Sequence, residues 1–142
     1  MHRLTLAQSN ALIDAALAKG AELQLKPLTV TVHDAGGNLI ACQRQDGASN
    51  MRVKLAGAKA SGALALGVSS RTIGDMALDR PHFIAAVDTM ADGGMVPAAG
   101  GVIVADADGT IVGAVGVTGD TSDNDEACAL AGIAAIGLKP FN

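Results

Sequence analysis

Residues 100–135 read GGVIVADADGTIVGAVGVTGDTSDNDEACALAGIAA, and this stretch decides the fold. Two apolar runs, 102–105 and 110–117, flank Asp106-Ala107-Asp108-Gly109, and an Asp-Gly between β-branched runs is a strong hairpin signal. Because successive rather than alternate residues are apolar, both faces of the hairpin need cover. The stretch therefore predicts a central hairpin, then an acidic loop and an alanine-rich helix over 123–136 that Ser122 caps.

The preceding residues predict further helices and a second hairpin. The pair Thr5 and Gln8 forms a capping-box pattern ahead of apolar residues at helical spacing, which predicts a helix over 5–25. Alternation over 28–33, the turn 34–38 and the run 39–44 predict the hairpin. Helices are expected over 51–66, 70–78 and 82–90, and a short edge strand over 95–97.

This order of elements defines a fold class. Nearly every strand connection is a hairpin, so we expect an α/β protein of the α+β type with a mainly antiparallel sheet. The first and last helices are expected on one side of that sheet. A length of 142 residues fits a single domain over 1–142.

Composition excludes several classes of partner. A net charge of −4 offers no basic stripe for nucleic acid. No apolar run is long enough to cross a bilayer and no signal peptide is evident, so we expect a cytoplasmic protein with Cys42 and Cys128 reduced. Hydrophobic residues make up 49% of the chain, with no Trp or Tyr, and this aliphatic surplus favours a homo-oligomer.

The helix over 51–66 carries the first candidate site residues. Arg52, Ala56, Lys59 and Ala63 fall in one stripe at helical spacing, so two cations flank a groove floored by alanine. Arg52 is a candidate carboxylate clamp and Lys59 a candidate acid or base. The structural alternatives are a surface cation for Arg52 and, for Lys59, a side chain whose stem covers apolar surface.

The acidic residues Asp120, Asp123, Asp125 and Glu126 have two open interpretations. They fail the calcium-loop pattern, because glycine at the sixth position and glutamate at the twelfth are absent. Capping of the following helix explains them without a ligand. The functional alternative is that Asp125 or Glu126 pairs with Lys59, which makes these three residues candidate catalytic groups for proton transfer.

His33 and three glycines complete the candidate set. His33 ends a strand beside Asp34, and it is either a hydrogen-bonded surface group or an iron ligand or proton carrier. The histidines show no metal-ligand spacing, so no metal site is predicted. Gly100, Gly101 and Gly116 are expected to let a ligand or a neighbouring subunit approach the backbone, as the floor of a pocket.

Four segments together resemble a known family. The segments HDAGGNLIACQRQDGAS, AGAKASGALALG, VPAAGGVIV and DGTIVGAVGVTGDTSDNDEACALAGIAAI are similar to those of the GlcG/HbpS family of haem-binding and haem-degrading-like proteins, which includes the C-terminal domain of PduO-type proteins. The resemblance covers almost the whole chain. Ile103 departs from the pattern where many members have Pro, and Thr118-Gly119-Asp120 replaces the commoner Ser-Gly-Gly.

The resemblance implies a fold, a cofactor and an assembly. It implies a profilin-like fold with a five-stranded antiparallel sheet, bound haem or iron, and a homo-oligomer, often a dimer-based octamer. The residues themselves make His33 the cofactor-binding candidate, with His82, Cys42, Cys128 and the methionines as the alternative iron ligands. Members also lie among genes for small-acid catabolism. Three functions stay open. The first is haem binding with storage or degradation. The second is a small isomerase- or lyase-type enzyme or accessory protein that acts on a carboxylate with Arg52, Lys59 and Asp125 or Glu126, and the third is a purely structural oligomeric partner.

Overall fold

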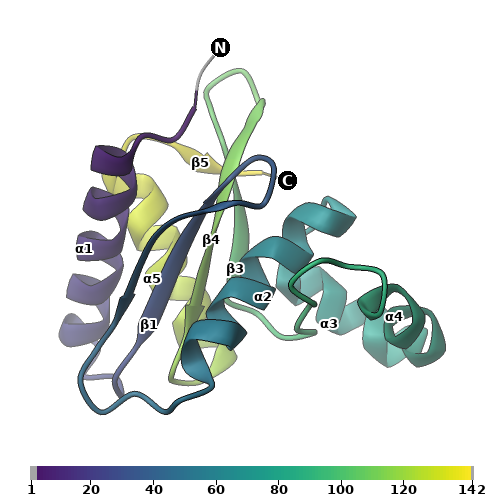
Figure 1. Ribbon diagram of the computed structural model, residues 1–142. Coiled ribbons are helices and arrows are strands. Elements are labelled where there is room, and N and C mark those ends of the chain that lie inside the picture. Colours follow the sequence, from purple (N-terminus) through teal and green to yellow (C-terminus); the bar gives the residue numbers. More distant parts are fainter. Residues whose placement is uncertain (1–2, 142) are drawn as a thin grey trace.

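The computed structural model describes residues 3–141, whose arrangement Figure 1 shows. In chain order the elements are α1 (Leu6–Glu22), β1 (Thr29–Asp34), β2 (Leu39–Arg44), α2 (Arg52–Leu66), α3 (Ser70–Asp79), α4 (Pro81–Asp88), β3 (Gly101–Ala105), β4 (Ile111–Thr118), α5 (Ser122–Ala135) and β5 (Lys139–Pro140).

The five strands form one antiparallel sheet in the order β2-β1-β4-β3-β5. The hairpin of β3 and β4 is central, as its sequence predicts: β4 pairs with both β1 and β3, and its residues are buried from Val112 to Thr118. β2 lies at one edge, and its burial is correspondingly incomplete. The predicted α+β class and the five-stranded antiparallel sheet are confirmed.

Helices cover both faces of the sheet. α1 and α5 pack against each other on one face, as predicted, over a core of leucine, isoleucine and valine side chains. α2 lies on the opposite face, against β1, β3 and β4, and α3 and α4 extend beyond it (Figure 1). Ile73, Ile84 and Met95 form a separate small core there.

The two hairpins turn in the same way. Asp34 and Asp106 each accept two backbone N–H groups of their own turn through one carboxylate oxygen. Gly37 and Gly109 take φ values of 85° and 82°, which favour glycine. These side-chain bonds replace backbone partners in the turn, so the Asp-x-x-Gly spacing fixes both hairpins.

Two sequence predictions are wrong in detail. Residues 95–97 form no strand, because Met95 instead packs against Gly62 of α2 and donates its N–H to Asp88; the fifth strand is Lys139–Pro140 beside β3. The cap of α5 is Thr121 rather than Ser122, since Thr121 has the extended backbone of a cap and accepts the N–H of Asn124. The capping box of Thr5 and Gln8 is confirmed.

Within residues 3–141, no helix combines the length and apolar character that a membrane crossing needs.

Candidate functional site

The sheet-facing side of α2, which carries Arg52, Ala56, Lys59 and Ala63, lies directly on glycines of the central hairpin. A Cβ on Gly116 would overlap the carbonyl oxygen of Ala56, and one on Gly101 would overlap the carbonyl oxygen of Lys59. A Cβ on Gly100, whose φ is 127°, would lie 2.8 Å from Lys59 Nζ. These three glycines therefore admit α2 of the same chain, and their role as the floor of a ligand pocket stays a prediction.

Lys59 and Asp125 form a buried ion pair between α2 and α5. Lys59 Nζ donates to Asp125 Oδ2 at 3.1 Å and to the carbonyl of Val117 at 3.0 Å, and the two side chains are 5% and 2% exposed. Asp125 Oδ1 also accepts the N–H of Asp120 at 3.0 Å. The sequence-based pairing of Lys59 with the acidic loop is thus realised through Asp125.

Burial governs the protonation of Lys59. Desolvation lowers the pKa of its ammonium, the carboxylate of Asp125 opposes that shift, and the nearby Arg52 guanidinium adds to it. The pair is well satisfied by hydrogen bonds, and neither residue lines the groove or the pocket described below. The buried pair joins the end of β4, α2 and α5.

Arg52 and Glu126 form their hydrogen bonds with residues outside this pair. Arg52, half-buried at the start of α2, donates to the hydroxyl of Thr118 at 2.8 Å, and it forms no ion pair within residues 3–141. Glu126 accepts Arg71 Nε through both carboxylate oxygens, each at 3.1 Å. Consecutive acidic residues of α5 therefore have different partners, and Glu126 does not contact Lys59 in the structure.

The outer side of α2 borders a groove that sequence reasoning missed. Lys54, Gly57, Ala58 and Ser61 recur at helical spacing along one wall. The other walls are His33, Gly37 and Leu39 of the first hairpin and Asp92 and Gly93 of the loop after α4, and the volume is about 530 Å³. A Cβ on Gly57 would meet nothing within 4 Å, so glycine here leaves the groove open.

His33, which is 6% exposed, lines this groove from the first hairpin, and both of its ring nitrogens are engaged. Nδ1 lies 3.2 Å from the carbonyl oxygen of Gly37, and Nε2 lies 3.1 Å from the hydroxyl of Thr31. Because a carbonyl only accepts, Nδ1 carries the proton and Nε2 accepts from Thr31. Burial lowers the pKa of His33, against opposing effects of the Gly37 carbonyl and Asp34, so the ring is neutral at pH 7.

The spacing of Lys54, Gly57, Ala58 and Ser61 was visible in the sequence as a second helical stripe. The stripe by itself predicts no binding site, because three of its four residues are small and Lys54 is typical of a solvated cation. What marks the stripe is the first hairpin folding over it, which places His33 opposite Gly57 and Lys54. That contact is between distant parts of the chain, so no local pattern predicts it.

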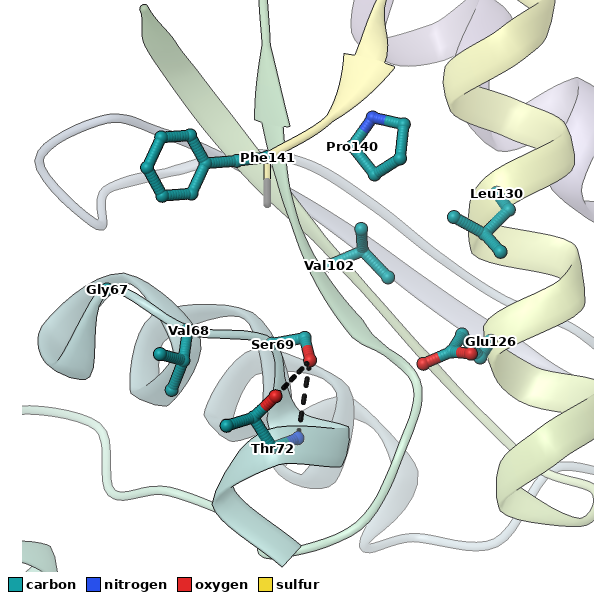
Figure 2. Close-up of a pocket in the computed structure, with 9 residues that line it drawn as sticks. All are labelled: Gly67, Val68, Ser69, Thr72, Val102, Glu126, Leu130, Pro140 and Phe141. Carbon is teal, nitrogen blue, oxygen red and sulfur yellow. Dashed lines mark hydrogen bonds between the residues drawn. The ribbon is translucent and has the colours of Figure 1, made fainter. Parts of the chain in front are cut away.

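A second hollow, of about 330 Å³, lies between the start of α3, α5 and the C-terminal strand β5 (Figure 2). Its walls are mainly apolar, and Glu126, Ser69 and Thr72 are its polar side chains. It contains no histidine, cysteine or methionine, the side chains that most often bind haem iron.

The chain belongs to the HbpS-like family of haem-degrading proteins, whose model matches residues 4–134. The match spans β1 to β4 and the helices on both faces of the sheet, ends before β5, and confirms the family that the four sequence segments indicate. No curated protein matches the chain.

Solved structures support the same assignment. The chain is similar to PduOC in its crystallised haem complex, at 25% identity and a TM-score of 0.86, over 99% of this chain and 100% of that one. It is similar to HbpS at 27% identity and a TM-score of 0.80, over 94% and 90% of the two chains. Klebsiella pneumoniae protein ORFY shares the fold, at 23% identity and a TM-score of 0.84, over 96% of this chain and 93% of that one.

Proposed function

We propose that this protein binds haem in the groove between α2 and the first hairpin. The observation that carries the proposal is a neutral imidazole, His33, in a groove of about 530 Å³, a volume within the range of roughly 300–1,000 Å³ typical of small-molecule sites. Membership of the HbpS-like family and the similarity to PduOC, which binds haem, support it.

The hydrogen bonds of His33 fit an iron ligand. Histidines that bind metals usually donate their other N–H to a carbonyl or carboxylate, which fixes the tautomer, and Nδ1 of His33 donates to Gly37 in this way. Nε2 then holds the lone pair. To bind iron, Nε2 gives up the hydroxyl of Thr31, and because Thr31 is buried, the unpaired hydroxyl costs about 1–3 kcal/mol.

The other residues of the groove suit the two chemical parts of haem. Gly57 and Ala58 are small and leave room for a planar ring, and Lys54 lines the same groove, where its ammonium suits the carboxylates of the propionate side chains. Bound haem supplies an iron centre whose reactivity depends on its ligand and on the polarity of its pocket.

A haemin titration followed through the Soret band tests this proposal. We expect a saturable shift with the native chain, loss of the shift in His33→Ala, and an unchanged shift in His82→Ala, whose histidine is exposed on α4. An identical titration for His33→Ala and the native chain would contradict the assignment of His33. Adding a reductant to the haem complex then distinguishes storage from degradation. Haem that is only stored keeps its Soret band, and haem that is degraded loses it.

The enzymatic alternative, in which Arg52 binds a carboxylate and Lys59 with Asp125 or Glu126 moves a proton, has less support from the geometry. Arg52 retains an unpaired charge among the described residues. Lys59 and Asp125, however, are closed off from solvent, and Glu126 is held by Arg71 instead.

The proposal includes a cytoplasmic homo-oligomer, most simply a dimer-based octamer, acting beside small-acid catabolism. The exposed apolar side chains support association, since Leu39 and Met51 are each 57% exposed and Val53 is 40% exposed. Light scattering after size-exclusion chromatography measures the assembly, and a monomeric mass at micromolar concentration would contradict it.

A further inference from the structure

The hollow between α3, α5 and β5 is built separately from the haem groove (Figure 2). Five apolar side chains surround it, from the α2–α3 connection, β3, α5 and the C-terminal segment: Val68, Val102, Leu130, Pro140 and Phe141. Its volume of about 330 Å³ is at the lower end of the range of roughly 300–1,000 Å³ for small-molecule sites. The space therefore suits a short aliphatic chain rather than a ring system as large as haem.

The polar groups of this hollow gather at one end. Figure 2 shows Glu126, from α5, and Ser69, from the start of α3, facing one another across the space. Arg71 Nε holds both oxygens of the Glu126 carboxylate from one side, which fixes its position and leaves lone pairs unused. Ser69 and Thr72 share a hydrogen bond between their hydroxyls at 3.2 Å.

Glu126 brings a carboxylate to that end, and Ser69 and Thr72 bring hydroxyls that both donate and accept. Arg71 pairs with both Glu126 and Asp123, so one guanidinium faces two carboxylates. Glu126 is the better shielded of the two acids, since its side chain is 20% exposed and that of Asp123 is 80% exposed. A ligand group that donates hydrogen bonds and carries positive charge meets this end favourably, and a carboxylate is repelled.

We propose that this hollow binds a small primary alkylamine in its protonated form. The alkyl chain packs on Val102, Leu130 and Phe141. The ammonium donates to the carboxylate of Glu126 and to the hydroxyl oxygens of Ser69 and Thr72. This assignment gives Glu126 a ligand-binding role in place of the proton transfer expected from the sequence, and it does not depend on haem.

Two-dimensional NMR of the ¹⁵N-labelled full chain at pH 7 tests the proposal with three probes of equal length. Pentylamine, 1-pentanol and pentanoate share the alkyl chain and differ in the head group. We expect saturable amide shifts around 67–72, 126–130 and at Phe141 with pentylamine. Pentanol should bind at least about tenfold more weakly, because it lacks a charge-assisted hydrogen bond, and pentanoate should give no shifts.

Variants separate the head-group contact from nonspecific binding of the alkyl chain. Glu126→Gln keeps the size of the side chain and should weaken pentylamine at least about tenfold, with little effect on pentanol. Glu22→Gln, on the exposed side of α1, is the matched control and should leave both unchanged. Equal binding of the three probes by the native chain would overturn the proposal, as would shifts confined to the His33 groove. Neither result bears on the haemin titration.

Discussion

The two sides of α2 show how one helix serves two purposes. On the sheet side, Gly101 and Gly116 belong to the strands, so the backbone of α2 packs directly against them. Lys59 is buried there in its ion pair with Asp125. On the outer side, the glycine belongs to the helix: Gly57 leaves open space beside His33 and Lys54. A glycine in the sheet lets the helix approach closely and closes that side. A glycine in the helix itself leaves space on the other side, where a ligand can bind.

The largest effect is expected from breaking the closed side. Lys59→Met leaves the carboxylate of Asp125 buried without its cation, which should lower the free energy of unfolding by about 3–5 kcal/mol. Urea denaturation measures this loss. Lys54→Met on the open side is the matched control and should change the free energy by less than about 0.5 kcal/mol. Similar losses of unfolding free energy in the two variants would contradict the distinction between a closed and an open side of α2.

Adding one methyl group to each side should change stability in opposite directions. Gly116→Ala places a Cβ against the carbonyl oxygen of Ala56, and the forced shift should cost about 1–3 kcal/mol. Gly57→Ala meets no neighbour within 4 Å and removes a glycine from a helix interior, which should add about 0.5–1 kcal/mol. Thermal unfolding of both variants checks the pair. A destabilised Gly57→Ala would show that the outer side is not open.

A smaller, pH-dependent effect is expected from His33. Because burial lowers its pKa from 6.5 in the native state, the unfolded chain holds more protons as the pH falls below 6.5. The free energy of unfolding should therefore decrease as the pH falls through this window, as far as the folded pKa. His33→Gln should flatten the decrease, measured by urea denaturation at several pH values.

The pH experiment needs two safeguards. His82→Gln, the control, should keep the native slope because His82 is exposed. Asp34 and Asp120 also have lowered pKa values, but their unfolded-state value is 3.8, so their contribution is lost at more acidic pH. An unchanged slope in His33→Gln would indicate that His33 is as solvated in the folded chain as in the unfolded one.

The fold could be predicted from the sequence because its signals are local. The Asp-x-x-Gly turns at Asp34 and Asp106 fix two hairpins, and the pair Thr5 and Gln8 starts the first helix. The fifth strand could not be predicted because Lys139–Pro140 has only two residues and shows no alternating pattern. It is defined by its pairing with β3, which is distant in the sequence.

The candidate site could be predicted only in part, because several of its contacts join residues far apart in the sequence. Helical spacing placed Lys59 on one stripe with Arg52, and the acidic loop supplied its partner, Asp125. Spacing could not show that the glycines opposite would close that stripe, since the contact of Gly116 with Ala56 joins residues far apart in the chain. Nor could it show that the first hairpin would bring His33 to the other side of the same helix.

The most direct test of the account fills the open side of α2 and leaves the closed side intact. In Gly57→Leu the added side chain enters the groove beside His33, while Ala65→Leu places the same side chain at an exposed position of the same helix. The account predicts that haemin titration of Gly57→Leu loses the saturable Soret shift and that Ala65→Leu keeps it, with both chains folded by circular dichroism. A native Soret titration in folded Gly57→Leu would contradict it.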